Sequence, residues 1–203
     1  MSFSKKFKQL GEVLNDNQIQ HIQRLPFPTS EEYTASEYFK NEIKITLESV
    51  PYNVSEFSIC ETLIYPILRE VWKPYLDIFN IWSRALVKLN VHIKGYPDYL
   101  IAKRSALSAV VFEKPLLAVV EAKKDDFSGA WGQCLYEMYA IQQLNEDKSM
   151  PVYGITSSGL IWQFGKLEGN TFTQYSTIFT ISDIDQLFSG LKTLFELCRL
   201  NIK

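Results

Sequence analysis

The sequence predicts a single α/β domain in which a central sheet is flanked by helices. Three observations lead to this fold class. The chain has 203 residues, 46% of them hydrophobic and 22% charged, which is ordinary for one globular domain. Helical periodicities lie towards both ends of the chain. Its middle consists of short apolar segments separated by turn residues, as expected of strands. We therefore expect one domain, 1–203, with one core.

The first part of the chain predicts helices. Residues 1–50 are expected to form a helical extension, because apolar positions recur at roughly helical spacing within 1–25 and again within 34–47. Residues 56–73 are rich in Ile and Leu and also predict a helix. Pro66 must either kink this helix or begin its main part, since proline is tolerated only in the first turn.

The pattern in the middle of the chain predicts strands, and the pattern from there to the C-terminal end predicts both strands and helices. Strands are expected over 82–94, 98–103, 109–112, 116–122, 151–156 and 160–167, with a further one after 168–170. Between them, a helix packed on the sheet is predicted by a stripe of apolar residues, namely Trp131, Cys134, Leu135, Met138 and Ile141. The final helix is expected over 182–199, with Ser182 or Asp183 as its N-cap.

Composition restricts the class of protein. No apolar run approaches the roughly 20 residues that span a bilayer, so we expect a soluble, cytoplasmic protein with no membrane partner. The three cysteines, Cys60, Cys134 and Cys198, are odd in number and far apart, which favours buried thiols over disulfides or a zinc site. A net charge of −2 argues against a strongly basic nucleic-acid coat protein, although a local basic patch remains compatible with it.

Three charged residues form a candidate site in the predicted sheet. Strand alternation places Glu121 and Lys123 on one face together with Leu117 and Val119, at the end of an apolar strand. Asp98 opens the strand expected to lie beside it. Magnesium binds one or two carboxylates together with water and substrate phosphate. The site is therefore suited to Mg²⁺, or Mn²⁺, and to phosphate chemistry, with Lys123 as the nearby point charge.

The order of these residues resembles a known family. Pro97-Asp98, then Glu121-Ala122-Lys123 closing an apolar strand, then a helix with Gln133, is similar to the PD-(D/E)XK nuclease superfamily. Within it, the pattern is most similar to the nuclease domains of restriction and recombination proteins. The resemblance covers about residues 56–167. It implies a restriction-endonuclease-like core, a central mixed β-sheet flanked by helices, with extra N-terminal and C-terminal helices.

The resemblance also implies a function and a role for each residue. It implies metal-dependent hydrolysis of phosphodiester bonds, with DNA as the expected substrate. The implied metal ligands are Asp98, Glu121, the backbone carbonyl of Ala122 and, as an outer ligand, Glu61. The implied catalytic residues are Asp98, Glu121, Lys123, which activates or orients the attacking water, and Gln133, which holds the water or the ligand set.

Further contacts are expected outside this set. Lys124, Lys103 and Arg104 are candidates for contacts with the phosphate backbone, although charge runs are also common on solvated surfaces. Many nucleases of the family work as dimers or in larger assemblies, so a homodimer or a protein partner is compatible with the resemblance.

Two other interpretations remain open. Glu121 and Lys123 would be an exposed pair at a strand end and Asp98 a turn residue if the motif match is accidental. Alternatively, the chain is a non-catalytic regulatory module that keeps the fold and binds nucleic acid or protein. Adjacent carboxylates repel one another without a cation, which favours the enzyme over the module.

Overall fold

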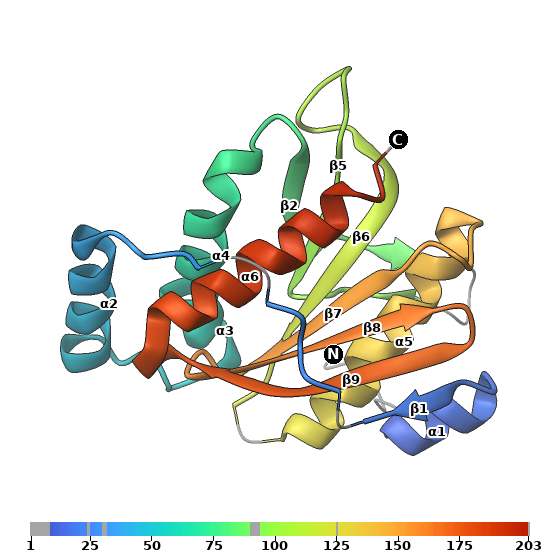
Figure 1. The fold of residues 1–203 in the computed structure, drawn as a ribbon, viewed down its shortest axis with the longest axis horizontal. Coiled ribbons are helices and arrows are strands. Elements are labelled where there is room, and N and C mark those ends of the chain that lie inside the picture. The colour runs from blue at the N-terminus through green and yellow to red at the C-terminus, as the bar shows by residue number, and fades with distance from the viewer. Residues whose placement is uncertain (1–8, 24, 30–31, 90–93, 125, 203) are drawn as a thin grey trace, which may run out of the picture.

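The computed structural model describes residues 9–23, 25–29, 32–89, 94–124 and 126–202. It is an α/β protein with a seven-stranded mixed sheet in the order β1-β9-β8-β7-β6-β5-β2, beside a small ribbon of β3 and β4 (Figure 1). The strands are β1 (Gln20–Ile22), β2 (Phe79–Ser83), β3 (Val87–Lys88), β4 (Lys94–Gly95), β5 (Tyr99–Arg104), β6 (Phe112–Ala122), β7 (Val152–Ser157), β8 (Ile161–Glu168) and β9 (Thr171–Thr180).

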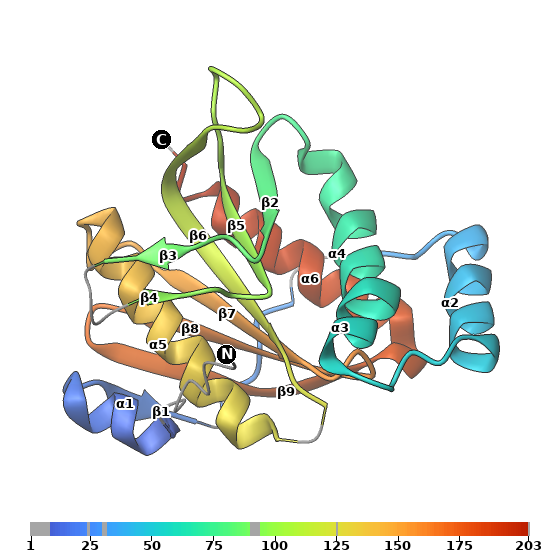
Figure 2. The same ribbon diagram turned by 180° about the vertical axis from the view of Figure 1, so that it is seen from behind.

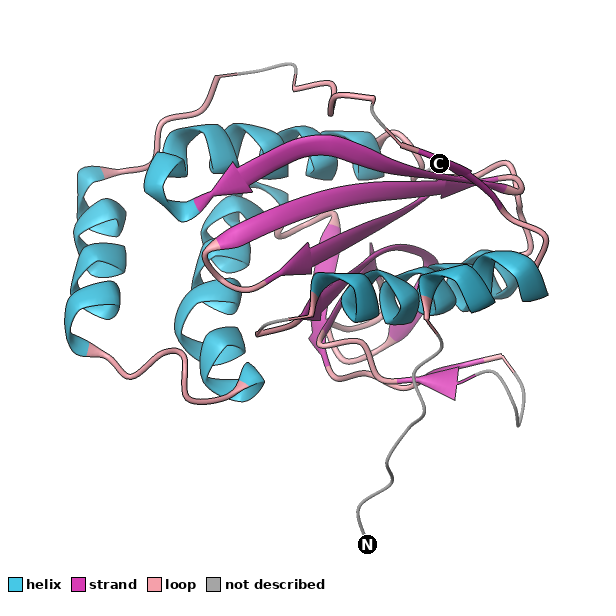
Figure 3. Ribbon diagram, turned by 90° about the horizontal axis from the view of Figure 1, so that it is seen from below, coloured by secondary structure: helices cyan, strands magenta, loops and turns pink. Residues whose placement is uncertain are grey.

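Helices cover both faces of this sheet. They are α1 (Leu10–Asp16), α2 (Glu37–Ser49), α3 (Glu56–Ile59), α4 (Tyr65–Trp72), α5 (Phe127–Asn145) and α6 (Ile184–Arg199). One hydrophobic cluster joins the sheet to α3, α4 and α6, and a second joins it to α5 and α1. α6 lies in front of the sheet in Figure 1 and α5 in front of it in Figure 2, while Figure 3 shows the sheet between them. The predicted α/β class with helices flanking a mixed sheet is confirmed.

The centre of the sheet combines parallel and antiparallel pairs. β6 is parallel to β7, whereas β5 runs antiparallel to β6, with Tyr99 opposite Val120. Parallel pairing requires a crossover, and α5 supplies it between β6 and β7. The apolar residues of β6 from Leu116 to Val120 are buried because helices cover this part of the strand on both faces.

The segment predicted as helix 56–73 contains a change of helix type at its middle. α3 passes into a π-helical turn over Cys60–Ile64, and α4 then begins with Pro66 in its first turn. Proline needs no hydrogen-bond donor in that position. Of the two alternatives for Pro66, the structure therefore has the one in which it begins the main part of the helix.

The predicted N-terminal helix over 1–25 is wrong in its extent. Within the described part of this range the helix is only α1, and β1 follows it and pairs in parallel with β9. The helix ends in the run Asn15-Asp16-Asn17, whose residues are poor helix formers, and Gln18 then turns the chain with φ +52°. Residues 1–50 are thus more than a helical extension, since β1 is the edge strand of the main sheet.

Two predicted strands have different boundaries. The strand expected over 82–94 is interrupted after Ser83, because Arg84 adopts a left-handed conformation with φ +51°, and 90–93 lie outside the described residues. The strands expected over 109–112 and 116–122 are one strand, β6, which passes through Pro115. Pairing with β7 begins only at Ala118, so Pro115 lies where the ladder does not need its missing N–H.

A β-bulge changes the face on which one predicted residue lies. The pairing of β6 with β5 shifts around Leu117, so that Leu117 joins Ala118 and Val120 in the cluster beneath α6. The prediction that Leu117 shares a face with Val119 is therefore wrong. Val119 packs with α5, and Glu121, two residues further, is on this face as well.

The remaining elements follow the prediction closely. α5 contains all five residues of the predicted apolar stripe, each buried, and α6 is capped by Asp183, whose side chain accepts from the backbone N–H of Gln186. β7, β8 and β9 fall where strands were expected. All three cysteines are buried free thiols. Among the described helices, none is both long and apolar enough to cross a membrane.

Close packing between α6 and β9 makes Gly190 a sensitive position. A Cβ atom there would lie 2.6 Å from Cζ of Phe179, inside the core. We expect Gly190→Ala to lower the free energy of unfolding by about 1–3 kcal/mol, the usual cost of overpacking. Gly11→Ala is the matched control: nothing lies within 4 Å of its Cβ position, so alanine should raise helix stability by up to about 1 kcal/mol. Equal changes in the free energy of unfolding for the two variants, measured by urea denaturation, would contradict this packing argument.

Candidate functional site

The structure brings Asp98, Glu121 and Lys123 together at one end of the sheet. Asp98 directly precedes β5. Glu121 is the last residue but one of β6, and Lys123 directly follows that strand. β5 and β6 are hydrogen-bonded neighbours, and Tyr99 faces Val120 across them. Adjacent strand ends therefore place the three side chains in the same region, as the pattern of the sequence predicts.

Asp98 is held on both of its carboxylate oxygens. Oδ2 accepts from the backbone N–H of Ala122 at 2.9 Å, and Oδ1 is 3.1 Å from Nη2 of Arg84. Burial raises the pKa of Asp98, whereas the hydrogen bond from Ala122 and the positive charge of Arg84 act in the opposite direction. Asp98 is thus fixed in place and is more than the turn residue of the alternative interpretation.

Glu121 is buried and lies next to a second buried carboxyl group. Its side chain is 1% exposed, and it is hydrogen-bonded to Glu137 of α5, which is 2% exposed. Burial raises the pKa of Glu121 well above its usual range, and the neighbouring Glu137 raises it further. A hydrogen bond between two carboxyl groups needs a proton on one of them. Glu121 is therefore not the exposed strand-end residue of the alternative interpretation.

Lys123 reaches a carboxylate from the helical segment on the other side. Its Nζ lies 3.2 Å from Oε1 and 3.3 Å from Oε2 of Glu56, the first residue of α3. The backbone N–H of Lys123 donates to the carbonyl of Ser157 at 2.9 Å, which continues the β6–β7 ladder. The lysine is thus mostly enclosed and directed towards α3.

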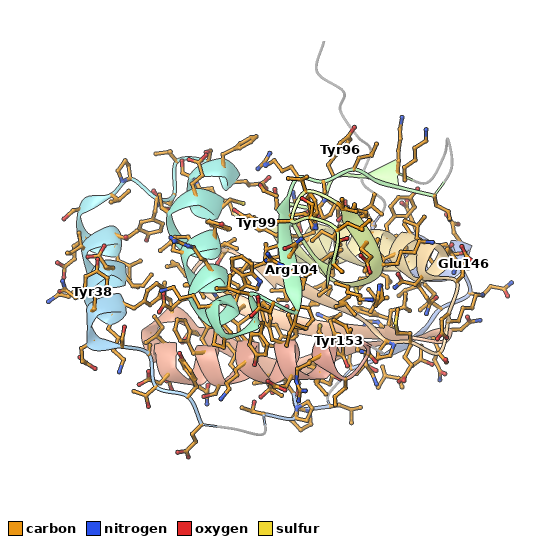
Figure 4. All side chains as sticks on the ribbon, turned by 90° about the horizontal axis from the view of Figure 1, so that it is seen from above. Tyr38, Tyr96, Tyr99, Arg104, Glu146 and Tyr153 are labelled. Carbon is orange, nitrogen blue, oxygen red and sulfur yellow. The ribbon has the colours of Figure 1, made fainter. Side chains whose placement is uncertain are left out.

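A tyrosine fixes that helical segment beside the site. The hydroxyl of Tyr99, the residue after Asp98, donates to the carbonyl of Cys60 at 3.1 Å, and its ring stacks on Tyr65. Figure 4 labels Tyr99 beside the helical segment. Glu61, the predicted outer metal ligand, lies exposed on the π-helical turn, and the carboxylate of this segment that reaches the site is Glu56. The role of Glu61 stays a prediction.

Polar atoms without partners surround the two buried carboxyl groups. Within the described residues, Oε1 of Glu121, Oε1 of Gln133 and Oγ1 of Thr156 are buried and accept or donate no hydrogen bond. Thr156 is opposite Glu121 in the β6–β7 register, and Gln133 precedes Glu137 by one turn of α5. Buried polar atoms are nearly always hydrogen-bonded, so this group has unused capacity for a ligand or for water.

The predicted phosphate-contacting residues lie in different places. Lys124 is exposed beside the site. Lys103 and Arg104 are at the far end of β5, roughly 16 to 20 Å along the strand from Asp98 at about 3.3 Å per residue. There Lys103 pairs with Glu113 at 3.2 Å, and Nη1 of Arg104 donates to the carbonyl of Leu76 at 2.8 Å. The structure does not bring these two residues together with the site.

Four residues at the site were not predicted from the sequence: Glu56, Arg84, Glu137 and Thr156. Glu137 has a signal in the sequence, because it follows Gln133 by four residues and directly precedes Met138 of the apolar stripe. Gly95 of β4 leaves room for it, since a Cβ there would lie 2.5 Å from Oε1 of Glu137. Arg84 and Glu56 lie on segments whose approach to the sheet depends on tertiary packing.

The residues present satisfy the requirements of a magnesium site only as a two-carboxylate set. Among the described residues, no group of three or more His, Cys, Asp or Glu side chains is arranged to hold a metal ion. Magnesium usually takes one or two carboxylates and keeps several waters, which Asp98 and Glu121 can satisfy. The unpartnered Oε1 of Glu121 is an available oxygen for this purpose.

No protein-family model matches this chain, and no curated protein matches it significantly. The functional assignment therefore depends on the geometry of the site itself.

The buried Glu121 predicts a pH dependence of stability. A carboxyl group with a raised pKa binds its proton more tightly in the folded state than in the unfolded one. The stabilisation of the folded state that this proton provides is present at low pH and is lost as the pH rises through the pKa of Glu121 in the folded protein. Without divalent ions, wild-type stability should fall relative to Glu121→Gln, which mimics the protonated form, as the pH rises above the ordinary pKa of a glutamate. Parallel urea-denaturation profiles for the two proteins would contradict this expectation.

Proposed function

We propose that this protein is a cytoplasmic, metal-dependent nuclease of the PD-(D/E)XK type, with a restriction-endonuclease-like core, that hydrolyses phosphodiester bonds in DNA. The observation that carries the proposal is the juxtaposition of Asp98, Glu121 and Lys123 at neighbouring strand ends, with Glu121 buried and one of its oxygens unpartnered among the described residues. Burying a carboxyl group beside another acidic residue costs stability, and a cation would offset that cost.

Each residue has a role in this proposal. Asp98 and Glu121 hold Mg²⁺ or Mn²⁺, and the carbonyl of Ala122 is a further ligand. When bound, the ion supplies charge stabilisation at the phosphate oxygens and lowers the pKa of a bound water. Lys123 orients the attacking water through its ammonium group, and Glu56, paired with Lys123, holds that group in position. Gln133 offers an unpartnered amide oxygen on the α5 side.

A second candidate function has an observation of its own. Two of the three charged residues already have counter-ions, since Asp98 pairs with Arg84 and Lys123 with Glu56. These ion pairs neutralise the site without a divalent cation. They favour a non-catalytic module that binds nucleic acid or protein through the same fold.

A cleavage assay separates the two candidates. Supercoiled plasmid, linear duplex and single-stranded DNA are incubated with the protein in Mg²⁺, in Mn²⁺ or in EDTA. The nuclease proposal predicts products in either metal and none in EDTA. The absence of cleavage on all three substrates, together with retained DNA binding, would favour the module.

A further inference from the structure

Arg84 is the cation nearest to Asp98 among the contacts in the described structure. It follows β2, and its left-handed backbone turns the chain directly beside the start of β5. Two contacts join it to Asp98: Nη2 lies 3.1 Å from Oδ1, and the backbone N–H of Arg84 donates to the carbonyl of Asp98 at 3.1 Å. The guanidinium therefore lies against the carboxylate to which the proposed function assigns the metal ion.

An exposed aromatic ring holds this guanidinium from the other side. The Cζ atom of Arg84 lies 3.8 Å from the centroid of the Phe57 ring, which belongs to α3. The Phe57 side chain is 58% exposed and that of Arg84 is 39% exposed, so the stacked pair faces solvent at the rim of the site. Stacking on an aromatic ring is a typical environment for arginine and leaves its N–H edge available for other partners.

A divalent ion and the Arg84 guanidinium compete for the same carboxylate. Both are cations, and both are attracted to Oδ1 of Asp98 at close range. When an ion binds Asp98, the negative charge that holds Arg84 is neutralised, and the ion and the guanidinium repel one another. The guanidinium then needs another anion, and its planar fork matches the geometry of a phosphate.

We propose that Arg84, supported by Phe57, is a phosphate-binding residue for the nucleic-acid substrate, and that it occupies Asp98 until a divalent ion takes its place. This inference depends on the proposed function, because it requires a metal at Asp98. It adds a substrate contact and an order of events to that function. Arg84 neutralises Asp98 before the ion binds, and it contacts a phosphate beside the metal site afterwards.

The two roles of Arg84 predict effects of opposite sign for one substitution. Arg84→Gln removes the charge and shortens the side chain, and it leaves a neutral amide in place of the guanidinium. Removing the competing cation should strengthen Mn²⁺ binding several-fold, as measured by calorimetry. Removing the phosphate contact should weaken oligonucleotide binding on the order of tenfold. It should also reduce the slope of log K against log salt concentration by about 1, the value for one phosphate contact. Fluorescence anisotropy with Mn²⁺ present, in the non-cleaving Lys123→Ala background, measures the second effect.

A matched control and a stability measurement exclude a merely structural role. Arg199→Gln removes a guanidinium of similar exposure that pairs with Glu196 on α6, and it should change neither affinity. If Arg84 only supports the fold, both affinities fall together with thermal stability, and the proposal is wrong. Unchanged affinity of Arg84→Gln for either Mn²⁺ or DNA also overturns the proposed role of Arg84. The proposed nuclease function still stands in that case if the wild-type protein cleaves DNA. A wild-type protein that binds neither Mn²⁺ nor DNA overturns both.

Discussion

Lys123→Ala is expected to reduce DNA cleavage by at least about a hundredfold, the usual effect of removing a group that assists proton transfer or stabilises developing charge. Lys123 is mostly enclosed, follows the strand that carries Glu121, and is held by Glu56 at 3.2 Å. Alanine removes the ammonium group at this position and leaves Asp98 and Glu121 in place. Initial rates on the substrate that the wild type cleaves best provide the measurement.

The neighbouring residue provides the control for this prediction. Lys124 is exposed, and Lys124→Ala removes the same charge one residue away. We expect cleavage by this variant to stay within a few-fold of the wild type, since a single phosphate contact has a modest effect. Equal losses in the two variants would show that net charge, and not the position of Lys123, determines the rate.

Asp98→Asn is expected to abolish detectable cleavage while the fold is retained. The asparagine oxygen still accepts the hydrogen bond from the N–H of Ala122. The substitution removes the charge and the ion pair with Arg84, and an ion pair of a partly exposed arginine contributes at most about 1 kcal/mol. Loss of a direct ligand should weaken metal binding by more than the roughly 10–100-fold that follows loss of an outer-shell partner. Metal affinity and cleavage should therefore fall together, whereas thermal stability without metal should change little.

An aspartate outside the site is the matched control for Asp98. Asp183 caps α6 by accepting from the N–H of Gln186, and asparagine is an equally good N-cap. Asp183→Asn should therefore leave stability, metal affinity and cleavage unchanged. Cleavage by Asp98→Asn at the wild-type rate would exclude Asp98 as a metal ligand.

The elements with a strong local pattern could be predicted from the sequence. The apolar stripe of α5 and the strands β5, β7 and β8 have the periodicity of their type over several residues, so local pattern and tertiary structure agree. The three site residues could be placed together for the same reason. A residue at a strand end has a predictable location once two strands are neighbours, and Pro97-Asp98 and Glu121 mark such ends.

The features that were missed depend on packing between distant segments. β1 has three residues, too few for a period to be visible, and it forms only because β9 offers an edge. The bulge at Leu117 results from pairing with β5 and has no glycine to mark it. Glu137 meets Glu121 because α5 packs across β6, and Arg84 meets Asp98 because of its unusual backbone conformation. Contacts of this kind are set by tertiary structure and not by local spacing.

Calorimetric titration of the wild-type protein with Mn²⁺ distinguishes a metal-dependent enzyme from a binding module most directly. The proposal that Asp98 and Glu121 form a cation site predicts saturable binding that Asp98→Asn weakens strongly and Asp183→Asn leaves unchanged. It also predicts that binding weakens at acidic pH, because burial and Glu137 raise the pKa of Glu121 and a proton there competes with the ion. The absence of saturable binding, or equal binding by all three proteins, would contradict the assignment of this site to metal-dependent phosphodiester hydrolysis.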